Sequence, residues 1–463
     1  MNRRDALKTM GTGFGMTALG GMLGGAALHA SQSQPVGTHF APKAKRVIFL
    51  FLNGGPSQVD TFDPKPALEK FHGTTEPGWE NGIIAPGNIV QAGTLMKSPF
   101  TFKKYGQSGI EVSSIFPKLG ECIDDVCVVR SMYSDIPNHP QGLFMMNCGT
   151  VVAGRPALGS WLLYGLGTEN RNLPGFVVLA PGLPIMAPQI WNSAFLPASY
   201  QGTWVNTEHS DPKKLIPFLQ NGQVGLAQQR KQVDLLTSLN EMHLKQQGPA
   251  PELEATIQGM ETAFRMQTEA VEVFDITKES EATRAAYGTG EFARGCLMSR
   301  RLVERGVRMV QVYFGNFQPW DNHDDIMIHR TLAAQADPPI GALLHDLKAS
   351  GMLDDTLVII GGEFGRTPVV EVSGLIKVQN GRDHNNQGFS YVLAGGGVKR
   401  GTVYGATDDF GFKAVENPVH IHDLHATVLH LMGLDHTRLT YRYSGRDFRL
   451  TDVAGTVVRD IIA

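Results

Sequence analysis

One stretch of the chain constrains the fold more than any other: Thr356-Leu-Val-Ile-Ile-Gly-Gly-Glu363-Phe-Gly-Arg366-Thr-Pro368. A continuous apolar run that ends in glycine is typical of a buried strand in a parallel sheet. Here the run stops at a carboxylate, Glu363, and a guanidinium, Arg366, follows three residues later. Because open α/β sheets bind ligands at the carboxyl ends of their strands, this stretch predicts a functional site at a sheet edge.

Further apolar runs predict neighbouring strands at residues 46–52, 126–130, 307–314 and 389–394. Between and after them, helical periodicity covers most of 226–305, and also 329–350 and about 422–432. Strands that alternate with helices predict an α/β fold, with a mainly parallel central sheet flanked by helices in a three-layer sandwich. We expect one domain over 46–463, with a mostly helical insertion around 226–290 and a polar linker at 31–45.

The amino terminus predicts export. Arg3 and Arg4 precede an apolar, glycine-rich run that continues to Ala30, which is typical of a twin-arginine signal peptide over residues 1–30. The alternative, a membrane anchor, is disfavoured because the run is short and broken by glycine. We therefore expect a periplasmic or extracellular protein with no membrane span in its mature chain. A net charge of −3 gives no indication of nucleic-acid binding.

A dense polar segment follows the predicted strand at 307–314. It contains Asp321, His323 and Asp325, and we expect Glu363 and His384 to lie near it. Carboxylates combined with imidazoles suit transition ions such as Zn or Mn, whereas sets made only of oxygen ligands favour Ca or Mg. The segment therefore predicts a divalent cation site. The structural alternative is a helix-capping loop, because Asp before a helix is a frequent N-cap.

The other polar candidates also have structural alternatives. Glu363 is either a bridging ligand or a carboxylate that supports another ligand, or else the ion-pair partner of Arg366. The planar fork of Arg366 also suits an anionic substrate oxygen. His139 is either a nucleophile or acid–base group, or a turn residue positioned by Pro140. His384 is either a ligand oriented by its neighbouring aspartate or part of a turn. The carboxyl-terminal histidines are expected to be structural, on a packing helix: His420, His422, His425 and His430.

Several short segments together resemble a known family. They are Phe51-Leu-Asn-Gly-Gly-Pro-Ser57, Asn138-His-Pro140, Gly154-Arg-Pro156, Trp320-Asp-Asn-His323, Gly362-Glu-Phe-Gly-Arg-Thr-Pro368, Gly381-Arg-Asp-His384 and Thr440-Tyr-Arg-Tyr-Ser-Gly-Arg-Asp447. The chain resembles a sulfatase-like family of exported bacterial proteins catalogued as domain of unknown function 1501, within the alkaline phosphatase superfamily. The resemblance covers nearly the whole mature chain and implies an alkaline phosphatase-like fold.

The resemblance also implies roles for individual residues. The superfamily's first metal-binding acid is replaced by Asn53, its nucleophile position holds Asn138 or His139, and its Asp-His pair reads Glu363-Phe364. We therefore expect a divalent cation (Zn, Mn or Ca), with a ligand set drawn from Asp321, His323, Asp325, His384, Glu363 and Asn53. The expected catalytic residues are His139, Asn138 and Arg366.

The implied activity is hydrolysis of sulfate or phosphate esters, on a small molecule or a polysaccharide, without the usual Ser, Thr or Cys nucleophile. The alternative is a non-catalytic relative that binds a glycan or a partner protein.

Overall fold

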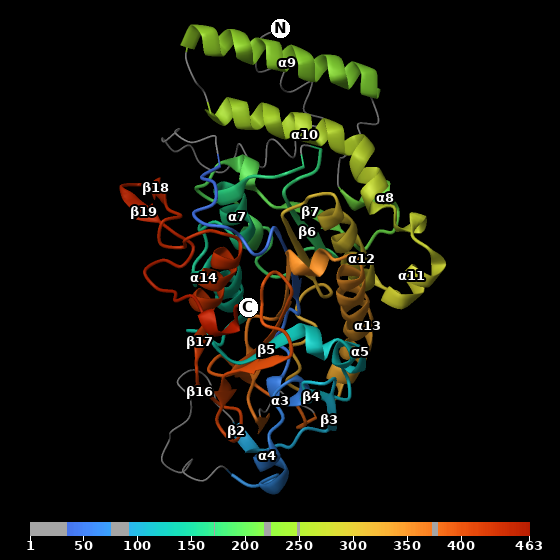
Figure 1. The fold of residues 1–463 in the computed structure, drawn as a ribbon, viewed down its shortest axis with the longest axis vertical. Coiled ribbons are helices and arrows are strands. Elements are labelled where there is room, and N and C mark those ends of the chain that lie inside the picture. Colours follow the sequence, from blue (N-terminus) through green and yellow to red (C-terminus); the bar gives the residue numbers. More distant parts are fainter. Residues whose placement is uncertain (1–34, 76–91, 171, 217–223, 248–250, 373–377) are drawn as a thin grey trace.

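The computed structural model describes residues 35–75, 92–170, 172–216, 224–247, 251–372 and 378–463. Within them, the centre of the fold is a nine-stranded sheet in the order β14-β5-β13-β9-β1-β8-β6-β7, with β17 also paired to β5 (Figure 1). The strands are β1 (Arg46–Phe51), β5 (Val126–Tyr133), β6 (Phe176–Ala180), β7 (Thr203–Asn206), β8 (Met309–Tyr313), β9 (Thr356–Gly361), β13 (Phe389–Ala394), β14 (Thr402–Tyr404) and β17 (Val419–His420).

The sheet is mainly parallel, as predicted. Strand β1 pairs in parallel with both β8 and β9, and β6 continues the parallel order from β8 to β7. Strand β13 runs antiparallel between β9 and β5, so β5 has the same direction as β9. The carboxyl ends of β1, β5, β8 and β9 therefore lie at one edge of the sheet, where the polar segments of the sequence follow them.

Helices cover both faces of the sheet because its strands are apolar on both sides. Successive side chains of a strand point to opposite faces. In β1, Ile48 and Leu50 join one core, and Val47, Phe49 and Phe51 join the other. The first core is packed by α5 (Pro117–Glu121), α12 (Glu291–Glu304) and α13 (Ile328–Ala349), and the second by α6 (His139–Cys148), α7 (Leu158–Leu166) and α14 (Ile421–Leu431).

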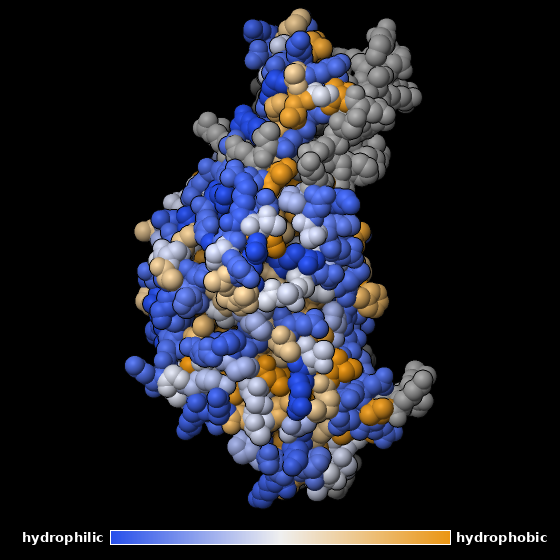
Figure 2. All heavy atoms as spheres, turned by 90° about the vertical axis from the view of Figure 1, so that its right-hand side faces the viewer, coloured by the Kyte–Doolittle hydropathy of each residue, from blue (hydrophilic) through white to orange (hydrophobic). Residues whose placement is uncertain are grey.

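The region predicted as a helical insertion lies between β7 and β8. It contains α9 (Leu226–Gln247), α10 (Pro251–Phe274) and α11 (Glu281–Tyr287). Figure 1 shows α9 farthest from the sheet, above α10. Ion pairing links the two helices, because Arg230 Nη1 on α9 lies 2.9 Å from Glu261 Oε2 on α10. Helix α9 exposes Leu235, Leu239 and Met242. The face of the molecule seen in Figure 2 is largely hydrophilic, with smaller hydrophobic areas between.

Short elements complete the fold around the sheet. They are α3 (Gln58–Thr61), α4 (Pro66–Lys70), α8 (Pro212–Leu215), β2 (Ala92–Leu95), β3 (Phe102–Tyr105), β4 (Ile110–Ser113), β10 (Gly365–Arg366), β11 (Val369–Glu371), β12 (His384–Asn385), β15 (Ala406–Thr407), β16 (Ala414–Glu416), β18 (Tyr441–Tyr443) and β19 (Arg446–Phe448). Among the described helices, none is both long and apolar enough to span a membrane. The predicted signal peptide lies outside the described residues, so export stays a prediction.

Candidate metal centre

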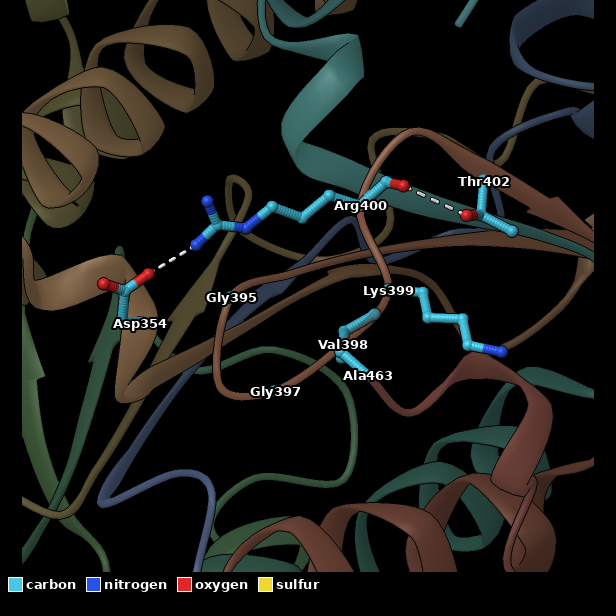
Figure 3. Close-up of a pocket in the computed structure, with 8 residues that line it drawn as sticks. All are labelled: Asp354, Gly395, Gly397, Val398, Lys399, Arg400, Thr402 and Ala463. Atoms are coloured by element: carbon cyan, nitrogen blue, oxygen red, sulfur yellow. Dashed lines mark hydrogen bonds and ion pairs between the residues drawn. The ribbon is translucent and has the colours of Figure 1, made fainter.

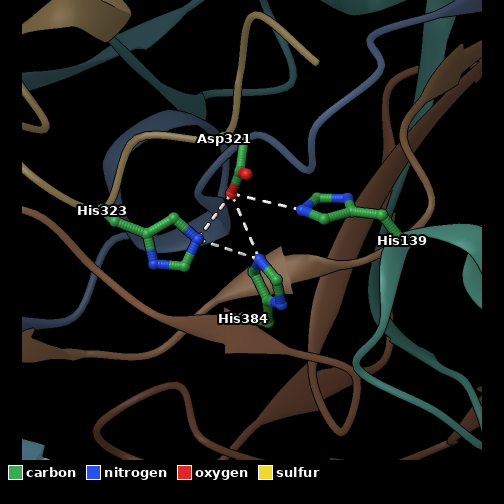
Figure 4. A group of neighbouring side chains, drawn as sticks. All are labelled: His139, Asp321, His323 and His384. Carbon is green, nitrogen blue, oxygen red and sulfur yellow. Dashed lines mark hydrogen bonds and ion pairs between the residues drawn. The ribbon is translucent and has the colours of Figure 1, made fainter. Parts of the chain in front are cut away.

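Polar residues from several elements gather at the carboxyl edge of the sheet, among them Asp321, Glu363 and His384, which were predicted to lie together. Asn53 follows β1, Asp321 follows β8, and Glu363 follows β9. His139 is the first residue of α6, which follows β5, and His384 lies in β12, which pairs with β10 at Arg366. Separate parts of the sheet edge thus place their side chains around one point, as Figure 4 shows for the histidines and Asp321.

A close backbone approach at Gly54 positions Asp321. Gly54 has φ +109°, and a Cβ atom there would lie 2.6 Å from the backbone nitrogen of Asp321 and 2.8 Å from that of Trp320. Only glycine combines this φ with this lack of space. The turn after β1 therefore packs directly on the loop that carries Asp321.

The centre of the cluster is one carboxylate oxygen. Asp321 Oδ1 lies 2.7 Å from His323 Nε2, 3.1 Å from His384 Nε2 and 3.2 Å from His139 Nε2. The Nε2 atoms of His323 and His384 lie 3.0 Å apart. All three imidazoles thus direct Nε2 to the same point, and we call these four side chains the histidine–aspartate cluster (Figure 4).

Each of the three imidazoles is held on its other side through Nδ1. His139 Nδ1 lies 2.6 Å from Glu363 Oε1, His323 Nδ1 contacts Glu371 Oε2, and His384 Nδ1 donates to the backbone oxygen of Pro137 at 2.7 Å. Metal-binding histidines usually donate Nδ1–H to a carboxylate or carbonyl in this way, which fixes the ring orientation.

The tautomer of His384 follows from its partner. The carbonyl of Pro137 only accepts, so Nδ1 of His384 carries the proton and Nε2 presents a lone pair. Burial lowers the pKa of His384 to about 3, which keeps the ring neutral. His384 can therefore act as a ligand at neutral pH without first losing a proton.

The pKa values of the other members of the cluster are shifted by their neighbours. Burial lowers the pKa of His323, but hydrogen bonds with Asp321 and Glu371 raise it more, to about 9. Burial also opposes protonation of His139, yet hydrogen bonds with Asp321 and Glu363 leave its pKa raised. Burial raises the pKa of Asp321, but Arg366 and the three histidines lower it far below its ordinary value.

Glu363 lies behind His139. Its two oxygens accept the backbone N–H of Gly54, at 3.0 and 3.1 Å, and Oε1 also contacts His139. The side chain is fully buried. Of the roles predicted for Glu363, its observed contacts match that of a carboxylate that supports another site residue, His139, and not an ion pair with Arg366.

Arg366 supports Asp321 from within the protein. Its guanidinium is fully buried, and Nη2 donates to Asp321 Oδ1 at 2.7 Å. Nε donates to the Gly55 oxygen, Nη2 also contacts the Gly54 oxygen, and Nη1 donates to the Arg382 oxygen at 3.3 Å. Contact with a substrate oxygen, the predicted role, would require Arg366 to give up one of these bonds.

Three of the predicted site residues have other surroundings. Asp325 Oδ1 accepts the backbone N–H of Met327 at 3.0 Å and the amide of Asn380 at 2.7 Å, so it caps the turn that leads into α13. Asn53 is buried, its amide donates to the backbone oxygen of Phe317, and its Oδ1 meets no partner among the described residues. Asn138 is exposed and precedes α6 as its N-cap. His139, predicted as catalytic, lies inside the cluster.

Sequence reasoning missed one residue close to the site. Glu371, at the end of β11, contacts His323. Its position in the sequence, three residues after Pro368, carries no signal that predicts this contact. Two of the carboxyl-terminal histidines have backbone partners: His422 Nε2 lies 2.9 Å from the Gly149 oxygen, and His425 Nε2 lies 2.8 Å from the Met146 oxygen.

A pocket with a volume of about 540 Å³ lies elsewhere in the molecule. Its lining includes Asp354, which precedes β9, and Gly395, which follows β13 (Figure 3). Since β13 is antiparallel to β9, both residues mark the edge of the sheet opposite to the histidine–aspartate cluster. The two basic side chains of this pocket, Lys399 and Arg400, point away from each other, and Arg400 pairs with Asp354.

The donor set of the histidine–aspartate cluster fits a divalent transition ion. Zinc–nitrogen bonds of about 2.0 Å in a tetrahedron place ligand atoms about 3.3 Å apart. The observed separations of 2.7–3.2 Å lie slightly below that value, as expected when hydrogen bonds hold the same atoms together. His139 Nε2 is buried 3.2 Å from Asp321 Oδ1 and faces the same point as the other two imidazoles, which also suits a shared cation. The residues present therefore fit such an ion.

A mainly parallel α/β sheet with a histidine and aspartate cluster at its carboxyl edge defines a candidate metalloprotein of the α/β class. The chain belongs to the family described as protein of unknown function DUF1501, whose model matches residues 44–462. This confirms the family that the sequence motifs resemble. No protein with a curated description matches the sequence.

Several solved structures share a distant likeness in fold. A sulfatase from Pseudoalteromonas sp. has 11% identity and a TM-score of 0.34, over 84% of this chain and 68% of that one. A phosphonate monoester hydrolase from Silicibacter pomeroyi has 12% identity and a TM-score of 0.31, over 69% of this chain and 68% of that one. An alkaline phosphatase superfamily protein from Vibrio parahaemolyticus has 11% identity and a TM-score of 0.36, over 94% of this chain and 76% of that one. These values carry no activity over to this chain.

Proposed function

We propose that the protein is a metal-dependent hydrolase of sulfate or phosphate esters. The observation that carries the proposal is the convergence of three Nε2 atoms on Asp321 Oδ1, each ring being held through Nδ1. Ligands that are oriented from behind are the arrangement that metal sites require. The ester class comes from the family resemblance, and a polysaccharide ester is the proposed substrate.

Asp321, His323 and His384 are proposed to hold the cation. Catalytic zinc sites typically have three protein ligands and keep a further position open. These three side chains are partly exposed, between 19% and 29%, so the site is reachable from solvent. A cation bound there would lower the pKa of a coordinated water and polarise an ester oxygen.

His139 is proposed as the proton acceptor for the attacking water. It is the most buried of the three histidines, and its Nε2 faces the point where the cation would bind. Glu363 holds its Nδ1, which orients the ring and raises the pKa of His139. A base whose second nitrogen is fixed by a carboxylate is a recurrent arrangement in hydrolases. Arg366 keeps Asp321 ionised and in place.

The competing function is binding of a glycan or a partner protein without catalysis. The observation that favours it is the exposed Asn138 at the position where the superfamily has its nucleophile, because an amide cannot form the usual covalent intermediate. The two functions differ in one measurable property. A hydrolase loses ester hydrolysis when His139 is replaced, whereas a non-catalytic binding protein has no such activity to lose.

The test compares His139→Gln with wild type for metal content and for hydrolysis of aryl sulfate and aryl phosphate esters. The variant should retain the cation and lose at least about 100-fold in kcat, the range of a positioned acid–base group. His345→Gln, at a largely exposed position on α13, is the matched control and should be unchanged. If the wild type is inactive on every ester although it holds the cation, the binding function replaces the hydrolase.

The proposed location is periplasmic or extracellular. It depends on Arg3 and Arg4, which lie in the predicted twin-arginine signal. Replacing both residues by Lys should leave the precursor in the cytoplasm. If the mature protein is still exported, the interpretation of residues 1–30 is wrong.

A further inference from the structure

His323 belongs to two groups of potential ligands. Its Nε2 faces Asp321 and His384, whereas its Nδ1 points away from them (Figure 4). Glu371 lies on that second side, and His323, Glu371 and Asp383 each offer one ligand atom that lies within 4.8 Å of the others. We call His323, Glu371 and Asp383 the outer group.

The surroundings of His323 differ from those of the other two histidines. His139 Nδ1 faces a single carboxylate whose oxygens already accept a backbone N–H, and His384 Nδ1 faces a carbonyl. His323 Nδ1 contacts Glu371, and a second carboxylate, that of Asp383, belongs to the same outer group. One carboxylate is enough to orient an imidazole, so orientation alone does not account for the second.

The chemistry of the outer group is that of a cation site. Two carboxylates brought together repel each other, and a bound cation relieves that repulsion. Asp383 Oδ1 accepts the backbone N–H of His384 at 2.7 Å, which fixes the carboxylate beside the cluster. The Glu371 side chain is 17% exposed and that of His323 29%, so an ion can enter from solvent.

We propose that His323 bridges two divalent cations. Nε2 would bind the first together with Asp321 and His384, and Nδ1 would bind the second together with Glu371 and Asp383. Both ring protons of His323 are released to solvent, which leaves an imidazolate between the ions. One nitrogen and two carboxylates suit Zn²⁺, Mn²⁺ or Cu²⁺ better than Ca²⁺, which prefers oxygen ligands. This inference rests on the proposed function, because it requires the first cation.

The geometry also indicates what the second cation would do. The two ring nitrogens lie on opposite sides of His323, so the two ions would not share one water. The second ion would instead fix the position of His323 and add positive charge beside the first. Such charge favours an anionic ester, since opposite charges near a site raise the local concentration of a charged substrate.

The test uses Cu²⁺ as the probe, loaded onto the metal-stripped full chain. Two copper ions bridged by an imidazolate couple magnetically, so the wild type should bind two Cu²⁺ per chain and show a strongly reduced mononuclear EPR signal. Glu371→Gln and Asp383→Asn should each bind one Cu²⁺ with the full mononuclear signal. Glu416→Gln is the matched control, because Glu416 ends the three-residue strand β16 as Glu371 ends β11. The control should behave as the wild type does.

The possible results separate this inference from the proposed function. A wild type that binds no Cu²⁺, and no Zn²⁺ or Mn²⁺, overturns both. A wild type that binds one ion with a full EPR signal overturns only the second site. In that case Glu371→Gln should weaken the single ion by roughly 10- to 100-fold, as the loss of an orienting carboxylate does. A variant of Glu371 or Asp383 that retains two coupled ions also contradicts the proposal. Circular dichroism of each variant verifies that it is folded.

Discussion

Glu363 Oε1 lies 2.6 Å from Nδ1 of His139, although the two residues are 224 positions apart in the chain. The carboxylate is fixed as well, because both its oxygens accept the backbone N–H of Gly54. Through these contacts, Glu363 joins the end of β9 to the start of α6 and to the turn after β1. The orientation of His139 is therefore set by three elements of the sheet edge, before any ligand binds.

Replacing Glu363 by Gln should separate orientation from metal binding. The amide retains the size of the side chain but loses the charge that holds His139 Nδ1–H. We expect the cation content to stay unchanged and kcat to fall by roughly 10- to 100-fold, the effect of losing a partner that orients a functional histidine. The rising limb of the pH profile of kcat should also move to lower pH. A variant with unchanged kcat would contradict the role assigned to Glu363.

Replacing Gly54 by Ala should disrupt the cluster through the backbone. The added Cβ would meet the backbone nitrogens of Asp321 and Trp320 at 2.6 and 2.8 Å, closer than real Cβ contacts allow. We expect loss of the bound cation. The matched control is Gly37→Ala, because Gly37 also has a positive φ, +85°, but has no neighbouring atom within 4 Å of the added Cβ. Metal analysis of both variants decides whether crowding or φ strain is the cause.

Metal affinity should increase with pH up to about 9. The pKa of His323 is raised to about 9, so below that pH the metal-free ring is protonated and a cation must displace a proton. Each pH unit below the pKa should therefore weaken binding by about tenfold. Titrations with Zn²⁺ in a competing chelator over the neutral to mildly alkaline range measure this slope. A flat profile would show that His323 is not a ligand.

Stability should decrease in acid because two buried histidines remain neutral in the folded state. Burial lowers the pKa of His329 and of His425 to about 3, against an ordinary value of 6.5. The unfolded chain therefore takes up protons below pH 6.5 that the folded chain does not, and stability is complete only above that pH. Each residue should reduce the free energy of unfolding by roughly 1.4 kcal/mol per pH unit between those two pKa values.

The variant His425→Gln isolates one of these contributions. His425 Nδ1 meets no hydrogen-bond partner among the described residues, so a second ring proton would be buried unpaired. Urea unfolding of wild type and variant, measured at several pH values from neutral to mildly acidic, should show a shallower decrease for the variant. Equal slopes would mean that His425 is not protonated on unfolding in this range.

The sequence predicted the framework well because the framework is local. Apolar runs identify β1, β5, β8 and β9, and helix α12 lies within the stretch of predicted helical periodicity at 226–305. The carboxyl ends of parallel strands meet at one edge, so the vicinity of Asp321 and Glu363 followed from topology. The antiparallel direction of β13 did not follow, because its apolar pattern is the same in either direction.

The partners within the site could not be predicted in the same way. Asp325 and His323 lie two residues apart, and only the backbone of the loop decides that His323 faces Asp321 while Asp325 accepts the N–H of Met327 in the turn before α13. Glu371 reaches His323 from a short strand whose position depends on pairing with β2, a long-range contact. The predicted ligand set was therefore placed in the correct part of the fold, whereas the individual contacts depend on tertiary packing.

One measurement decides whether the histidine–aspartate cluster holds a cation. It is the metal content of wild-type protein purified from the exported fraction, measured together with the melting temperature before and after chelation. We predict at least one stoichiometric transition ion and a lower melting temperature after chelation, because an ion that binds only the folded state stabilises it. His384→Ala should lose both the ion and the response to chelator, whereas His425→Gln should keep both. The histidine–aspartate cluster is not a metal centre if the wild type carries no stoichiometric metal, binds none when it is supplied, and has the same melting temperature with and without chelator.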